Sequence, residues 1–356
     1  LADTITVVTS VVTPLVDAAI IDGENFKVNG GQGSDGQVLT STGSGVAWEA
    51  AAGGGPTSKT FGTSSLMVGD NATGTIDAAN YNTGVGVDVF EDLTSGDNNA
   101  AFGFFALGNN TSGGNNTMVG AYAGALNIDD ADNTAVGYAA NYPDGGSRVT
   151  AVGSQALNAN TANDNTAVGF AAMTATTTGH SNTAMGKRAL QTNTTGIQNT
   201  SLGASSMSAN TEGATNTAVG ENALASNTTA SSNTAVGSAA LTTNTTGTAN
   251  VAFGSLSADA NTTGSYNTAI GYGTLTANTT GHDNTAVGIN SLAANTTAHY
   301  NTAVGSSALE GCTTGEYNTA VGQLAMDAAS MTGNFNSALG RAALGANTTG
   351  SSNCAV

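Results

Sequence analysis

Histidine is the side chain in this sequence best suited to acid–base or metal chemistry, and only three are present. They are His180, His282 and His299, and each lies eleven residues after a glycine that recurs along the chain. A fold that repeats every 17 residues would stack His282 and His299 in neighbouring turns. Neighbouring imidazoles can hold a metal ion, but many residue types occupy this position in other repeats. We therefore interpret the pair as part of a variable, solvent-facing surface and predict no metal site.

Aromatic residues recur at the next position of the repeat, towards the end of the chain. Tyr266, Tyr300, Tyr317 and Phe335 occupy it, and Asp283 interrupts them. Aromatic faces can stack on sugars or support protein contacts. The sequence thus favours packing between neighbouring turns, with a surface contact stripe as the alternative role of the same residues: Tyr266, His282, His299, Tyr300, Tyr317 and Phe335.

No other residue set is spaced for catalysis. No Ser-His-Asp or Cys-His arrangement stands out, and no pair of carboxylates is singled out among the 24 acidic residues. Cys312 and Cys354 are 42 residues apart, which is roughly 12 Å along a stack of strands and beyond disulfide reach. We predict a protein that is not an enzyme, with no cofactor.

The composition excludes several classes of partner. Lys and Arg total only 6, the formal charge is -18, and the isoelectric point is near 4.1. Such a chain lacks the basic surface that binds nucleic acid. No stretch approaches 18 apolar residues, so the sequence predicts no membrane insertion.

A 17-residue repeat organises most of the chain. The string Asn-Thr-Ala-Val-Gly recurs from Gly69 to Gly340, and thirteen of sixteen intervals between its glycines are 17 residues long. The consensus is N-T-A-V-G-x-x-A-L-x-x-N-T-T-G-x-x. Thr, Asn and Gly are weak helix formers, and no 3.6-residue period is present. The pattern predicts an all-β parallel β-solenoid, or β-roll, over residues 61–356, which end inside a repeat.

Stacking identical turns places like residues on top of one another. Each asparagine of the repeat can then donate to one neighbouring turn and accept from the other. The best-conforming repeats predict a structural ladder of Asn165, Asn182, Asn199, Asn216, Asn233, Asn250, Asn267, Asn284, Asn301 and Asn318.

The apolar positions suggest how the solenoid is stabilised. We expect the Val and Leu positions to form an interior seam, which is thin for a free-standing rod. Additional burial would come from identical rods packed side by side, with the Ala positions allowing close approach. The sequence therefore predicts a homo-oligomer.

Two likenesses to known families rest on these residues. The unit with its N-T-A-V-G core resembles the β-roll heads of trimeric autotransporter adhesins. It is still more similar to the shafts of bacteriophage tail fibres, and residues 36–48 (GQVLTSTGSGVAW) resemble a short module found near such shafts. The resemblance implies a homotrimer in a virion, bound to other tail or baseplate proteins and contributing to attachment to a host surface glycan or protein. Residues 1–60 would be a β-rich attachment or linker segment.

Three other functions fit parts of the pattern. A bacterial surface adhesin head would share the repeat and lie outside the cell. A tailspike depolymerase would align distant acids on the solenoid. An ice-binding solenoid would use flat rows of Thr, but Thr shares its face with Val, which we expect to point inwards. The phage tail-fibre shaft is the leading hypothesis.

Overall fold

The computed structural model describes residues 78–143 and 146–356, preceded by the strand residues 27–28, 31–32, 37–41, 46–50, 58–61 and 65–68. The chain divides into two units, residues 1–55 and 56–356. Most of the attachment or linker segment expected over residues 1–60 lies outside the described residues.

The first unit contains two short antiparallel strand pairs. Strand β1 (Lys27–Val28) pairs with β2 (Gly31–Gln32), and β3 (Gln37–Ser41) pairs with β4 (Val46–Ala50). The segment 36–48, which carries the likeness to a phage module, supplies β3 and the first part of β4.

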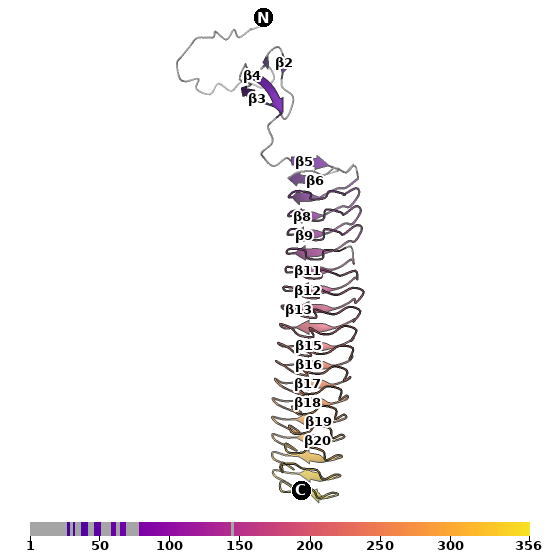
Figure 1. Cartoon of the computed structure of the whole chain (residues 1–356), viewed down its shortest axis with the longest axis vertical. Helices are drawn as coiled ribbons and strands as arrows, with labels where there is room; N and C mark the ends of the chain where they lie inside the picture. The colour runs from indigo at the N-terminus through magenta and orange to yellow at the C-terminus, as the bar shows by residue number, and fades with distance from the viewer. Residues whose placement is uncertain are drawn as a thin grey trace, which may run out of the picture. The chain divides into compact units, whose positions relative to one another are not determined.

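The second unit is a parallel β-solenoid of about 16 turns with about 17 residues each, as the repeat predicted, and the described residues contain no helix. It begins with β5 (Ser58–Phe61), which runs antiparallel to β6 (Ser65–Val68). One strand per coil then follows in parallel along the unit (Figure 1). These strands are β7 (Thr83–Val85), β8 (Ala100–Phe102), β9 (Thr117–Val119), β10 (Thr134–Val136), β11 (Thr150–Val152), β12 (Thr166–Val168), β13 (Thr183–Met185), β14 (Thr200–Leu202), β15 (Thr217–Val219), β16 (Thr234–Val236), β17 (Val251–Phe253), β18 (Thr268–Ile270), β19 (Thr285–Val287), β20 (Thr302–Val304), β21 (Thr319–Val321), β22 (Ser337–Leu339) and β23 (Cys354–Ala355).

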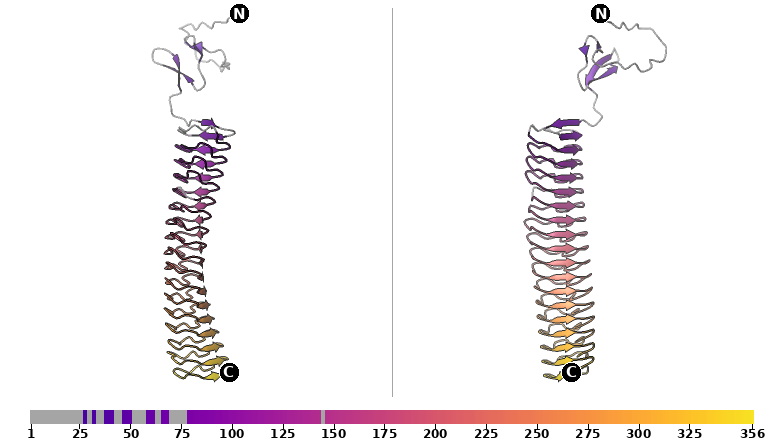
Figure 2. Two further views of the ribbon diagram at one scale, coloured as in Figure 1. Left: turned by 90° about the vertical axis from the view of Figure 1, so that its right-hand side faces the viewer. Right: turned by 180° about the vertical axis from the view of Figure 1, so that it is seen from behind.

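The strands form one column on one side of the solenoid, and the turns form the other side (Figure 2). Equivalent residues pair between coils, so that Thr217 lies beside Thr234 and Val219 beside Val236. Thr and Val favour extended backbone because they are β-branched. The glycine that follows ends each strand: Gly220 has φ of +132°, and a Cβ there would lie 2.5 Å from the carbonyl oxygen of Gly237.

The Val position points outwards, so the expected interior Val seam is wrong. In β15, Ala218 is fully buried whereas Thr217 and Val219 are partly exposed. Larger residues at the Val position are more exposed, with Leu202 at 42% and Phe253 at 56%. The Ala positions line the interior, so they also cannot be the surface through which rods approach one another.

The asparagine ladder explains this orientation. Asn216 and Ala218 are two residues apart and point to the same face of an extended segment. The Asn216 side chain reaches inwards to donate from Nδ2 to the carbonyl oxygen of Ala230 at 2.8 Å. Ala must then face inwards with it, and Thr and Val must face outwards. The Thr row lies outside as well, which removes the sequence-based reason against an ice-binding surface.

The core consists of Ala from the strand and a Leu-type residue from the facing turn, and the two positions compensate in size. Most coils combine Ala with Leu or Met, as in Ala218 and Leu224, which are both fully buried. Where the turn supplies Phe90, the strand supplies Gly84, whose added Cβ would meet the ring at 2.8 Å. Where the strand supplies Met118, the turn supplies Gly124, whose Cβ would meet the sulfur at 2.7 Å. Each coil thus fills a nearly constant interior volume, as close packing requires.

Three further positions in each coil adopt the left-handed backbone conformation. In the coil after Gly220 they are Asn222 (φ 56°), Leu224 (φ 52°) and Ser232 (φ 63°). This conformation costs a non-glycine residue about 1–2 kcal/mol. The conformation directs alternate backbone N–H groups to the preceding and the following coil. Asn222 N–H donates to the carbonyl oxygen of Ala204 in the preceding coil, and Leu224 N–H donates to that of Ala240 in the following coil, both at 3.0 Å.

Candidate functional site

Part of the predicted contact stripe is a stack of exposed rings. Tyr300, Tyr317 and Phe335 lie in three successive coils, with ring centroids 4.8 and 5.0 Å apart and planes tilted by 17° and 10°. All three side chains are exposed. Because each ring lies face to face with the next, the facing surfaces of the rings are used for contacts between coils.

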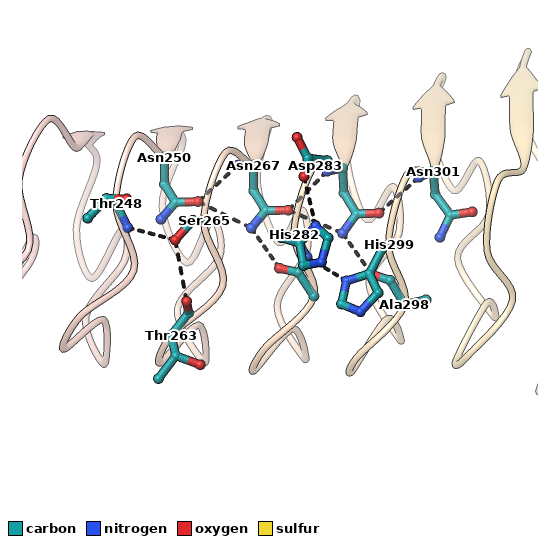
Figure 3. Close-up of polar contacts among 12 residues, drawn as sticks. Thr248, Asn250, Thr263, Ser265, Asn267, His282, Asp283, Ala298, His299 and Asn301 are labelled. Atoms are coloured by element: carbon teal, nitrogen blue, oxygen red, sulfur yellow. Dashed lines mark hydrogen bonds and ion pairs between the residues drawn. The ribbon is translucent and has the colours of Figure 1, made fainter.

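His282 and His299 stack in neighbouring coils beside these rings (Figure 3). Their ring centroids are 3.7 Å apart, and Tyr300 meets the edge of the pair at 5.3 Å from His282. The backbone N–H of His282 donates to Nδ1 of His299 at 3.0 Å, so that nitrogen carries no proton. Partial burial and the neighbouring His282 lower the pKa of His299. The arrangement favours a neutral imidazole that is held in place by the fold.

The remaining stripe residue, Tyr266, is separated from the stack by Asp283. It lines a hollow of about 280 Å³ together with Thr263, Ser265, Thr280, His282 and Asp283. His282 Nδ1 lies 2.7 Å from the Asp283 carboxylate. Five of the six predicted residues, from His282 to Phe335, therefore form one row of ring contacts, and Tyr266 adjoins it at the hollow that it shares with His282.

The ten predicted ladder asparagines are all buried and act in the structure, not at the surface. Asn267 is typical (Figure 3): its Nδ2 donates to Oδ1 of Asn250 at 3.2 Å and to the carbonyl oxygen of Gly281 at 2.8 Å. Its backbone N–H also donates to Asn250 Oδ1, at 2.9 Å. Such side chains have no capacity left to bind a ligand.

A second ladder runs along the turns and is interrupted by a cysteine. Asn244 Nδ2 donates to Asn227 Oδ1 at 3.1 Å, and its own Oδ1 accepts from Asn261 at 2.8 Å. Cys312 replaces asparagine further along, and Oδ1 of Asn295 is left without a partner. Burial raises the pKa of the Cys312 thiol to about 11. Cys312 and Cys354 are both free, which confirms that they form no disulfide.

Charged and metal-ligating side chains form only small groups in the described residues. No group of three or more His, Cys, Asp or Glu side chains is placed to hold a metal ion among them. Arg148 and Asp164 form an exposed ion pair at 2.7 Å, and the hydrogen bond from Arg148 lowers the pKa of Asp164. This pair joins neighbouring coils.

Sequence reasoning missed a second aromatic group nearer the start of the solenoid. It comprises Phe104, Phe105, Tyr122, Tyr138 and Tyr142, with ring centroids 5.2–6.3 Å apart. Five aromatic residues within 39 positions exceed the 5% average of the chain, and this density was the available signal. They occupy several positions of the repeat, so an alignment by columns does not bring them together.

Comparisons with protein-family models, curated proteins and solved structures give no match. The likeness to tail-fibre shafts therefore remains a hypothesis from the sequence, and the function must be argued from the geometry. Within the part of the chain that the structure describes, no helix is long and apolar enough to cross a membrane.

Proposed function

We propose that the chain is the shaft of a homotrimeric fibre of a phage virion, which contributes to attachment to the host cell. The observation that carries this proposal is the apolar row on the outer face of the strand column. At the Val position of the repeat, exposed side chains recur along the solenoid: Val85, Phe102, Val119, Val136, Met185, Leu202, Phe253, Ile270, Val304 and Leu339.

A second copy of the chain is the partner that fits this row. Long exposed apolar surfaces mark sites of association. The row repeats once per coil, so only a partner with the same axial spacing can meet every coil in the same way. An identical chain in register meets that condition, and closed symmetry keeps the assembly finite. The number three and the place in a virion come from the resemblance to tail-fibre shafts.

Engineered disulfides test this contact. In a Cys354→Ser background, Val219→Cys places a thiol on the strand face, and three copies around one axis would bring these thiols together. We expect mild oxidation to give covalent dimers on a denaturing gel, since a disulfide joins two of the three chains. The control Thr229→Cys lies exposed on a turn and should stay monomeric. Equal cross-linking of both variants, or of neither, would contradict the proposal.

The outward Thr row favours ice binding as a second candidate. Thr183, Thr200 and Thr217 lie in successive coils with methyl and hydroxyl groups facing outwards. The apolar row beside them varies in height, however, because Met185, Leu202 and Phe253 replace Val. An uneven row of side chains is better suited to a self-complementary protein interface than to binding the flat surface of an ice lattice. Freezing-point hysteresis at micromolar protein would favour this second function, and its absence would remove it.

A further inference from the structure

The aromatic group missed by the sequence borders a hollow on the first third of the solenoid. The hollow has a volume of about 410 Å³ and is lined by Tyr122, Tyr138, Ala139, Tyr142, Gln155 and Asn158. These residues come from the turns that follow β9, β10 and β11. The volume lies within the usual range of small-molecule sites, about 300–1,000 Å³.

The rings in this hollow are arranged differently from those of the predicted stripe. Tyr122 meets Tyr138 at 87° and Tyr142 at 64°, with centroids 6.2 and 6.3 Å apart. None of these pairs is stacked face to face, so mutual stacking does not consume the ring faces. In the stripe, Tyr300, Tyr317 and Phe335 lie nearly parallel and cover one another. The ring faces in the hollow are therefore not paired with one another, as those of the stripe are.

The polar groups of the hollow suit a neutral, hydroxyl-rich ligand. Three phenol groups and two carboxamides line it, and none of the six lining residues that the structure describes is charged. Asn158 is fixed, because its Nδ2 donates to the carbonyl oxygen of Ala139 at 3.1 Å. The backbone N–H of Gln155 donates to the carbonyl oxygen of Tyr138 at 2.8 Å, whereas its side-chain carboxamide forms no hydrogen bond with a described residue and is free to bind. Aromatic faces combined with amide donors and acceptors match the C–H faces and hydroxyl groups of a sugar.

The coils around the hollow depart from the repeat at a cost to stability. The intervals from Gly137 to Gly153 and from Gly153 to Gly169 have 16 residues rather than 17. Asn141 replaces the buried Leu, and its Oδ1 is buried without a partner. Departures that weaken packing concentrate at functional sites. From the hollow, its chemistry and this departure, we infer that these coils bind a neutral saccharide.

This inference deepens the attachment role and rests on the proposed function for its biological meaning. Its test uses the full chain in solution, with an array of neutral oligosaccharides of glucose, galactose, mannose and N-acetylglucosamine. Sialylated and uronic acid oligosaccharides serve as charged comparators. We expect binding to neutral glycans. Absence of neutral binders, or binding of charged glycans alone, would overturn the inference.

Two tyrosines provide a matched pair of variants for the strongest neutral glycan. Tyr138 and Tyr272 each follow the strand glycine, and they are 54% and 55% exposed. Only Tyr138 lines the hollow. By calorimetry, Tyr138→Ala should weaken binding at least tenfold and Gln155→Ala should also weaken it, whereas Tyr272→Ala should bind as wild type. Equal affinities of Tyr138→Ala and Tyr272→Ala would overturn the site.

The oligomeric mass of the same samples separates this inference from the proposed function. An assembled protein that binds no neutral glycan overturns only the saccharide site. A monomer that binds the glycan through Tyr138 supports the site and contradicts the proposed fibre. Melting temperatures of the variants should match wild type, because both tyrosine rings are exposed.

Discussion

Asparagine side chains carry much of the specificity of this solenoid. Asn244 Nδ2 donates to the carbonyl oxygen of Gly247 at 2.9 Å and to Asn227, while its Oδ1 accepts from Asn261. Two of these bonds join neighbouring coils, and the third joins the side chain to the backbone of its own turn. An unpaired buried polar group costs about 1–3 kcal/mol, so the ladders hold the register of coils that have little apolar core.

Removal of one ladder amide should therefore be costly. Asn244→Ala removes three buried hydrogen bonds and leaves Asn227 Oδ1 without a partner, and we expect it to lower the free energy of unfolding by about 3 kcal/mol. Urea denaturation followed by circular dichroism measures this loss. Thr246→Ala, an exposed change in the same turn, should cost little. A similar small effect of both variants would show that the ladder does not stabilise the coils.

His299 should make stability sensitive to mild acid. Burial and His282 lower its pKa in the folded protein, while Glu316 and Asp283 oppose this shift. The unfolded chain, with an ordinary pKa of about 6.5, then binds a proton before the folded chain does. The stability that neutral His299 contributes is fully present above the pKa of the unfolded chain. It is lost as the pH falls from there through the lower pKa of the folded protein.

Melting temperatures at pH 7.5 and pH 5.0 test this effect. We expect His299→Gln to show a smaller loss on acidification than wild type. The control His180→Gln removes an exposed histidine of the same repeat position and should behave as wild type. An unchanged acid response in His299→Gln would contradict the assignment.

At the scale of the coil, the strand and the facing turn supply interior side chains of complementary size. Gly124 faces Met118, whereas other coils place Leu opposite Ala. Gly124 has φ of +57°, close to the +52° of Leu224, so its backbone already suits Leu. Gly124→Leu alone should cost about 1–3 kcal/mol through overpacking against Met118.

A double substitution tests whether this contact causes the loss. Adding Met118→Ala to Gly124→Leu recreates the consensus pair and should restore the urea midpoint to wild type or above. The two substitutions should show a coupling of about 1–3 kcal/mol. Additive effects would mean that the two residues do not share one interior space.

The repeat made the strands and the buried ladders predictable, because a fixed spacing stacks Asn on Asn and histidine on histidine. It did not reveal that Leu224 and two further positions per coil adopt a left-handed backbone, which non-glycine residues usually avoid. Nor did alternation within Thr-Ala-Val reveal which face is buried. The hydrogen bond from Asn216 to Ala230 decides it, and that contact joins residues 14 positions apart.

At the scale of the whole molecule, the exposed row offers the additional burial that the thin interior of the solenoid calls for. A rod whose interior holds Ala and one Leu-type residue per coil can place its remaining apolar side chains on one outer face. Few charges lie on this chain, which limits repulsion between identical rows stacked at about 4.8 Å. The same face could then join identical chains along their length.

The repeat does not predict the proposed saccharide hollow, because the residues that line it do not follow the consensus. Tyr122, Tyr138 and Tyr142 occupy three different positions of the repeat in two neighbouring coils, and two coils there are one residue short. Only the folded chain brings their rings together. Sites of this kind arise where the repeat is broken, so a consensus conceals them.

Sedimentation equilibrium of the wild-type chain at micromolar concentration tests the central claim most directly. The account predicts a mass of three times the 34.5 kDa of one chain. It also predicts dissociation when Val219, Val236 and Val287 on the strand face are all replaced by Glu, but not when Thr229, Thr246 and Thr297 on the turns are replaced. A wild-type mass of 34.5 kDa would contradict the account.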